Sequence, residues 1–144
     1  MGENFNFLVY LIEDDKVFEY MVGYMVGSEG NKHVKTFNNV EDCLNENNET
    51  PKCIILDHHL ESNITGLDSL PKLQKRFLGV PIFVLSSQDD ASVAIEYINK
   101  GVSDYIVKNY DGLIKLTQSI NDLKDGKIKS NKNYFLDLFR KFFN

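Results

Sequence analysis

The stretch CIILDHHLE, residues 53–61, decides how this chain folds and where its chemistry lies. Four apolar residues form an uninterrupted run that ends on Asp57, and two histidines follow at once. A short apolar run with polar residues on both sides is typical of a strand buried on both faces of a parallel sheet. A carboxylate at the end of such a strand can be a structural cap, a metal ligand or a nucleophile.

Four more segments predict strands, and helical patterns separate the five. Apolar runs lie at residues 7–12 and 82–85, and shorter candidates at 33–37 and 105–107. Apolar residues at helical spacing predict helices at residues 16–27, 40–47, 67–77, 91–100 and 113–123. Strands that alternate with helices in this way predict an α/β fold, with a parallel sheet and helices on both of its faces.

Proline and aspartate residues predict where three of these helices begin. Pro71 moves the expected start of the third helix to Ser69 or Leu70, because proline suits a first helical turn. An aspartate at position 89 or 90 is the expected N-cap of the fourth helix. Asp111 is the expected N-cap of the fifth.

Polar residues end four of the five predicted strands. Acidic residues 13–15 follow the first strand and Asp57 ends the third, while Ser86 and Lys108 follow the fourth and fifth. Ligands of such sheets bind at the carboxyl ends of the strands. Clustered carboxylates raise each other's pKa unless a cation compensates them. We therefore predict a functional site at this edge of the sheet.

These residues resemble the receiver domain of two-component response regulators. The matching pieces are LIEDD (11–15), IILD (54–57), FVLSS (83–87) and GVSDYIVK (101–108), in order and with similar spacing. The resemblance implies a flavodoxin-like fold, a five-stranded parallel sheet in the order 2-1-3-4-5. It also implies a receiver domain at residues 1–125 and a cytoplasmic location.

The resemblance assigns a nucleophile and a metal site. Asp57 matches the phosphoacceptor aspartate of the family. Glu13 and Asp14 match the acidic pair that binds Mg²⁺ together with Asp57, and His59 falls where the family supplies a backbone carbonyl to the metal. Asp15 is expected to be an exposed neighbour.

The resemblance also assigns the residues that respond to phosphorylation. Ser86 and Lys108 match the catalytic hydroxyl and lysine, and Ser87 stands where a small residue leaves room for the phosphoryl group. Tyr105 matches the aromatic switch. Ser86 would donate a hydrogen bond to the phosphoryl group, and Tyr105 would then rotate into the space that is vacated.

Three departures from the family pattern leave alternatives open. Asn109 stands where the family usually has proline, Glu61 where proline is common, and Gly66 comes one position later than usual. One alternative is a receiver-like interaction module that is never phosphorylated. Another is an aspartyl-phosphate hydrolase, which usually needs a second acid where His59 stands. Adjacent histidines do not suit a dedicated zinc site, because neighbours on an extended segment point in opposite directions.

The composition of the chain limits the class of protein to which it can belong. The chain of 144 residues is 42% hydrophobic, which predicts one globular domain without a membrane span or secretory signal. Cys43 and Cys53 lack a metal-ligand spacing and indicate a reducing compartment. The first 123 residues carry ten basic and nineteen acidic side chains. This acidic body argues against direct nucleic-acid binding.

The end of the chain differs from the rest. Residues 124–144 carry six basic and two acidic side chains. Residues 126–132 (GKIKSNK) predict a basic linker, and residues 134–143 (YFLDLFRKFF) predict an amphipathic helix. This helix could pack on the domain, form a dimer contact or dock on a partner, whereas membrane contact is less expected. The face of the fourth helix, fifth strand and fifth helix is a second candidate dimer surface.

The sequence therefore predicts a stand-alone receiver, not an enzyme in the usual sense. It would accept a phosphoryl group on Asp57 from a sensor histidine kinase or a phosphotransfer protein, with Mg²⁺ as cofactor. Its output would be a surface that contacts a downstream protein effector.

Overall fold

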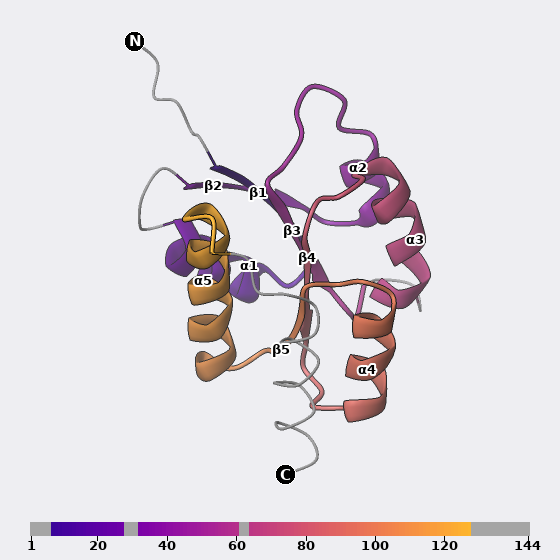
Figure 1. Cartoon of the computed structure of the whole chain (residues 1–144), viewed down its shortest axis with the longest axis vertical. Coiled ribbons are helices and arrows are strands. Elements are labelled where there is room, and N and C mark those ends of the chain that lie inside the picture. Colours follow the sequence, from indigo (N-terminus) through magenta and orange to yellow (C-terminus); the bar gives the residue numbers. More distant parts are fainter. Residues whose placement is uncertain (1–6, 28–31, 61–63, 128–144) are drawn as a thin grey trace.

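A five-stranded sheet forms the centre of the computed structural model, which describes residues 7–27, 32–60 and 64–127 (Figure 1). All neighbouring strands are parallel, in the order β2-β1-β3-β4-β5. This confirms the predicted fold and strand order. The strands are β1 (Phe7–Ile12), β2 (Lys32–Phe37), β3 (Cys53–Asp57), β4 (Ile82–Ser86) and β5 (Asp104–Val107).

Helices cover both faces of the sheet. One face packs against α1 and α5, and the other against α2, α3 and α4 (Figure 1). The helices are α1 (Lys16–Gly27), α2 (Val40–Leu44), α3 (Gly66–Arg76), α4 (Ala91–Asn99) and α5 (Tyr110–Lys124). None of these helices is both long and apolar enough to cross a membrane.

The alternation of β3 decides which side chains share a face at its end. Cys53 and Ile55 belong to the apolar cluster under α1 and α5, whereas Ile54 and Leu56 belong to the cluster under α3 and α4. Because side chains alternate along a strand, Asp57 continues the α1/α5 side. The next residue then continues the α3/α4 side. Every residue of β3 is buried, as the apolar run predicted.

The start of α3 differs from the prediction. Thr65 caps the helix: its side chain accepts from the Asp68 amide at 3.3 Å, and the Asp68 carboxylate accepts from the Thr65 amide at 3.0 Å. This capping box satisfies two backbone donors at once. The helix therefore begins at Gly66 and takes Pro71 into its interior. The predicted start near Ser69 was wrong: the helix is already capped at Thr65 and continues through Pro71.

The start of α5 also differs, whereas that of α4 agrees. Asp90 caps α4 through the amides of Ser92 and Val93, as predicted. Asn109, not Asp111, caps α5, and its side-chain oxygen accepts from the Gly112 amide at 2.7 Å. Asp111 instead lies in the first turn, where an acidic side chain suits the helix dipole.

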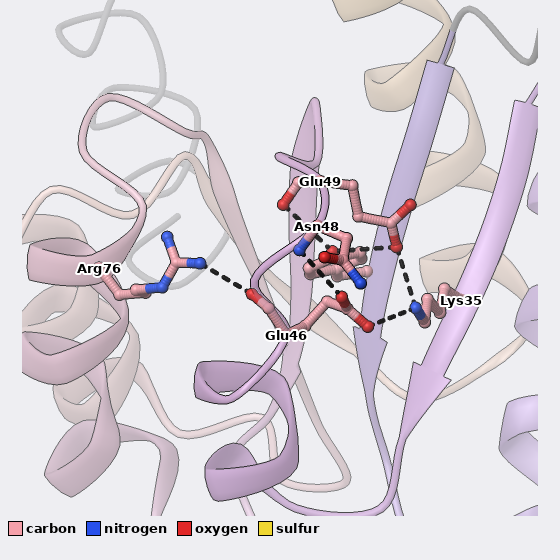
Figure 2. Close-up of polar contacts among 6 residues, drawn as sticks. Lys35, Glu46, Asn48, Glu49 and Arg76 are labelled. Carbon is pink, nitrogen blue, oxygen red and sulfur yellow. Dashed lines mark hydrogen bonds and ion pairs between the residues drawn. The ribbon is translucent and has the colours of Figure 1, made fainter.

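A polar network fixes the loop between α2 and β3 (Figure 2). Lys35 Nζ lies 2.6 Å from a Glu46 carboxylate oxygen and 3.0 Å from one of Glu49. Arg76 donates to the Glu46 carbonyl at 2.7 Å, and the Tyr10 hydroxyl donates to the Glu49 carboxylate at 3.2 Å. The network ties β2, this loop and α3 together and contains none of the predicted site residues.

The predicted boundary after residue 125 stays a prediction. The chain is described to Lys127, where Gly126 adopts a positive φ after the end of α5. The rest of the predicted linker and the amphipathic helix at 134–143 lie outside the described residues, and so does Glu61.

Candidate functional site

Three carboxylates meet at the carboxyl edge of the sheet. Glu13 directly follows β1, Asp14 comes next, and Asp57 ends β3. One oxygen from each lies within 4.8 Å of the others. Glu13 and Asp57 are buried and Asp14 is half-buried. Asp15 is exposed, and its carboxylate instead accepts from an amide of α1 at 3.0 Å.

Lys108 brings a positive charge to this cluster from the end of β5. Its Nζ lies 2.8 Å from Glu13 Oε2, 3.2 Å from Asp57 Oδ1 and 4.8 Å from the centre of the Phe18 ring. Burial disfavours the ammonium form, but the hydrogen bonds and charges of the two carboxylates outweigh it, so the pKa of Lys108 is raised. The amide of Lys108 also donates to the Ser86 carbonyl at 2.7 Å.

Burial perturbs the carboxyl group of Glu13. Burial raises its pKa to about 7, the Lys108 contact opposes this shift, and the nearby Asp57 adds to it. Its Oε1 accepts from the Asp15 amide at 3.1 Å. Within the described part of the chain, Oε2 has its ionic contact with Lys108 but no hydrogen bond of normal geometry. One lysine thus leaves this buried acid incompletely compensated.

These donors fit a divalent cation. Carboxylate oxygens are ligands that Mg²⁺ prefers, and among the described residues the buried Glu13 Oε2 makes no hydrogen bond that would compete with a cation. The amide of His59 donates to Asp57 Oδ1 at 3.2 Å, and the His59 side chain is exposed. The imidazole is thus no member of the cluster, and a metal-ligand role for the His59 carbonyl stays a prediction.

The predicted switch residues lie on the neighbouring strands. Ser86 is fully buried, and its hydroxyl accepts from the Gln88 amide at 3.1 Å. Tyr105 is also fully buried, and its hydroxyl donates to the Gln88 carbonyl at 2.7 Å. We expected this inward position of Tyr105 to follow phosphorylation, and it is the position that the structure shows. Ser87 is exposed beside the site.

Sequence reasoning missed a buried contact next to Asp57. Nδ1 of His58 lies 2.6 Å from the Tyr97 hydroxyl, and both side chains are buried. Burial lowers the pKa of His58, as does the neighbouring His59. The alternation of β3 signals that His58 points away from Asp57. No local pattern signals that its partner is a tyrosine 39 positions later.

A parallel sheet with an acidic cluster and a lysine at its carboxyl edge is the arrangement of a signalling receiver. The response regulator receiver domain family matches residues 9–121, so this chain belongs to that family. Its acidic cluster is consistent with the divalent-metal site typical of receivers.

Two curated relatives agree with this assignment. The chain is 27% identical over 103 residues to the transcriptional regulatory protein TdiR of Thauera aromatica, which covers 71% of this chain and 44% of the relative. It is 28% identical over 104 residues to the response regulator protein TmoT of Ectopseudomonas mendocina, covering 72% and 46%. The chain thus spans less than half the length of these relatives.

Solved structures share the fold. The receiver domain of Francisella response regulator 1452 superposes with a TM-score of 0.70 at 23% identity, covering 83% of this chain and 97% of that one. The RcsB response regulator of Salmonella typhimurium gives a TM-score of 0.78 at 13% identity, covering 96% and 69%. At these identities the likeness is one of fold.

Proposed function

We propose that this receiver accepts a phosphoryl group on Asp57 in a Mg²⁺-dependent reaction in the cytoplasm. The observation that carries the proposal is the meeting of Glu13, Asp14, Asp57 and Lys108 at one edge of the sheet. The donor would be a sensor histidine kinase or a phosphotransfer protein, in keeping with the general partners of receiver domains.

The residues divide the chemistry between them. An oxygen of Asp57 would form the new bond to phosphorus while the bond from phosphorus to the donor atom breaks, and the leaving group keeps the electron pair. Glu13, Asp14, Asp57 and the His59 carbonyl would hold Mg²⁺, which neutralises phosphoryl charge when bound. Lys108 pairs with Asp57 before transfer and would pair with a phosphoryl oxygen afterwards.

The hydroxyl of Ser86 would couple phosphorylation of Asp57 to a movement of the loop after β4. It would donate to a phosphoryl oxygen while it keeps its contact with Gln88, so the loop after β4 would be drawn towards the site. Gln88 also holds the Tyr105 hydroxyl. This movement would change the surface of α4, β5 and α5, which we propose as the contact for a downstream protein effector.

A protein donor needs a surface beside Asp57, and α1 offers one. Val17, Tyr20 and Tyr24 lie at helical spacing and are 70%, 75% and 69% exposed. The helix begins three residues after Glu13, so this apolar stripe starts next to the acidic cluster. We propose it as the surface on which the phosphodonor protein docks.

Intact-protein mass spectrometry tests the reaction. Incubation with Mg²⁺ and a small acyl phosphate should add the mass of one phosphoryl group, and a chelator should prevent it. Asp57→Asn should abolish the gain, whereas Asp15→Asn, a change in an exposed acid outside the cluster, should preserve it. The proposal is wrong if Asp57→Asn gains the same mass at the same rate.

A further inference from the structure

Both backbone polar groups of His58 are hydrogen-bonded. Its amide donates to the Leu85 carbonyl of β4, and its carbonyl accepts from the Gly66 amide at the start of α3, each at 2.8 Å. The side chain follows the alternation of β3 and turns to the side of α3 and α4, opposite Asp57. Asp57 and His58 are thus neighbours in the chain whose side chains lie on opposite faces of the sheet.

Tyr97, in the last turn of α4, contacts that ring. Its hydroxyl lies 2.6 Å from Nδ1 of His58, and the two rings meet edge to face with centroids 5.4 Å apart. Gly66 makes room for this contact, because a Cβ at that position would collide with the Tyr97 hydroxyl. The place for the hydroxyl thus depends on the only residue type without a side chain.

Tyr97 in turn borders the switch tyrosine. The Tyr97 and Tyr105 rings lie 5.9 Å apart at an interplanar angle of 34°. Tyr105 donates to the Gln88 carbonyl, and the Gln88 amide donates to Ser86. A continuous series of contacts therefore leads from His58 through Tyr97 of α4 and Tyr105 of β5 to Gln88 and then to Ser86 at the end of β4.

We propose that His58 and Tyr97 are positioning residues whose hydrogen bond stabilises the buried position of Tyr105. This bond holds the hydroxyl end of Tyr97 and the backbone of α4 holds the other end. The Tyr97 ring is therefore restrained in its contact with the Tyr105 ring. This proposal rests on the proposed receiver function, because it assigns part of the switch equilibrium to a contact outside the Asp57 and Ser86 pair.

The size of the effect follows from the buried polar atoms. Removing the Tyr97 hydroxyl leaves Nδ1 of His58 buried without its partner, and Tyr97 loses its anchor. A hydrogen bond that is made in only one of two states changes their equilibrium by about fivefold, and we propose that this bond is made when Tyr105 is buried. Tyr97→Phe keeps the ring and removes only the hydroxyl, so it isolates this contact.

The experiment measures the position of Tyr105 by ¹⁹F NMR on protein labelled with 3-fluorotyrosine. The Tyr105 resonance is assigned by its loss in Tyr105→Phe, and its exposed fraction is read from the shift between H₂O and D₂O. Tyr97→Phe should lower the ratio of buried to exposed Tyr105 by about fivefold. The first set of samples contains a chelator and no phosphodonor.

Tyr10→Phe is the matched control. Tyr10 is also fully buried in the cluster under α3 and α4, and its hydroxyl donates to Glu49 in the network of Figure 2. It has the same chemistry as Tyr97, but its ring contacts among the described residues are with Phe37 and Phe77. Its loss should leave the Tyr105 ratio unchanged, even where it costs similar stability.

Gly66→Ala breaks the contact by a second route. The new methyl group would displace the Tyr97 hydroxyl, so the Tyr105 ratio should fall in the wild-type background. It should fall less in the Tyr97→Phe background, where the hydroxyl is gone. Equal effects in the two backgrounds would mean that the methyl group acts through Asp57 or Leu56, and would overturn the proposal.

The remaining outcomes also decide. An unchanged ratio in Tyr97→Phe, or an equal fall in Tyr10→Phe, overturns the positioning role. The samples without donor are informative even if Asp57 proves not to be phosphorylated, so failure of the proposed function is recognised separately. If Asp57 is phosphorylated and Tyr97→Phe leaves the ratio unchanged, only the present inference fails.

Discussion

At the carboxyl edge of the sheet, the side chains on one face interact through charges and those on the other through a hydrogen bond between neutral groups. On the side of α1 and α5, Lys108 lies within 3.2 Å of carboxylate oxygens of Glu13 and Asp57. On the side of α3 and α4, His58 and Tyr97 share a hydrogen bond between buried, uncharged groups. Asp57 and His58 are adjacent in the chain, and the alternation of β3 alone puts them in these different surroundings.

This difference suggests that the charged face governs phosphorylation of Asp57 and that the neutral face governs the position of Tyr105. The charged face depends on protons and cations, because its acids are incompletely compensated by one lysine. Neutral buried hydrogen bonds depend on shape and on partners of the right geometry. Changes on the charged face should therefore alter stability with pH and Mg²⁺, while changes on the neutral face should alter the position of Tyr105.

The largest expected effect is the pH dependence that Glu13 imposes. Its pKa is raised to about 7 from a usual 4.5, so its contribution is fully present below pH 4.5 and is lost as pH rises through 7. Without divalent cations, the free energy of unfolding should fall on the order of 2 kcal/mol between pH 5 and 8 from this group. Urea unfolding of the protein and of Glu13→Gln at both pH values isolates the difference.

Addition of Mg²⁺ sharpens the same measurement. The cation needs the deprotonated carboxylate, so its affinity should rise with pH and restore stability at pH 8. A Glu13→Gln variant with the full pH dependence of the wild-type protein would show that another group causes it.

Lys108→Ala should have the next largest effect. The fold should stay intact, but the acids lose a buried hydrogen-bond donor, so the free energy of unfolding at pH 8 should fall by about 1–3 kcal/mol. Phosphorylation-induced NMR shifts around Tyr105 should weaken. Lys115→Ala is the control, since Lys115 also pairs with a buried acid, Asp104, at 3.4 Å. Normal shifts in Lys108→Ala would exclude a coupling role.

Asp14→Ala tests the metal site within the charged face. Asp14 belongs to the cluster, whereas the exposed Asp15 caps α1. Titration calorimetry should show Mg²⁺ affinity weakened at least about tenfold in Asp14→Ala and little changed in Asp15→Ala. Equal losses in the two variants would contradict the assigned ligands.

The sheet and the charged face were predictable from local signals. The run at residues 7–12 is β1 residue for residue, because apolar side chains fill it and Glu13 ends it. Asp57 ends a strand, Glu13 and Lys108 directly follow strands, and parallel strands bring their carboxyl ends to one edge. Helix ends were less predictable: α2 stops at Leu44 with a cap at Asn45, although the periodic pattern continues to residue 47.

The neutral face was not predictable because its contacts depend on several distant choices at once. His58 meets Tyr97 only because α4 packs on that face of the sheet and Gly66 leaves space for the hydroxyl. In the sequence, Tyr97 resembles an ordinary core aromatic of an amphipathic helix. A charged residue at the end of a strand can be recognised in the sequence of that strand alone. A hydrogen bond between two elements can be predicted only when the packing of both elements is known.

The smallest expected effect concerns the cap that follows Lys108. Asn109→Ala should lower the free energy of unfolding by about 1 kcal/mol, because the Gly112 amide loses its acceptor. Asp111→Ala should change it by only a few tenths, since its contribution is a dipole contact at an exposed position. Urea unfolding distinguishes the two.

On the other face, Thr65→Ala should lower the free energy of unfolding as much as Asn109→Ala does, because the α3 capping box is lost. Only Asn109 adjoins the lysine of the charged face, so only Asn109→Ala should also slow phosphorylation of Asp57. Equal slowing by Thr65→Ala would show that the two faces are not separable at this edge.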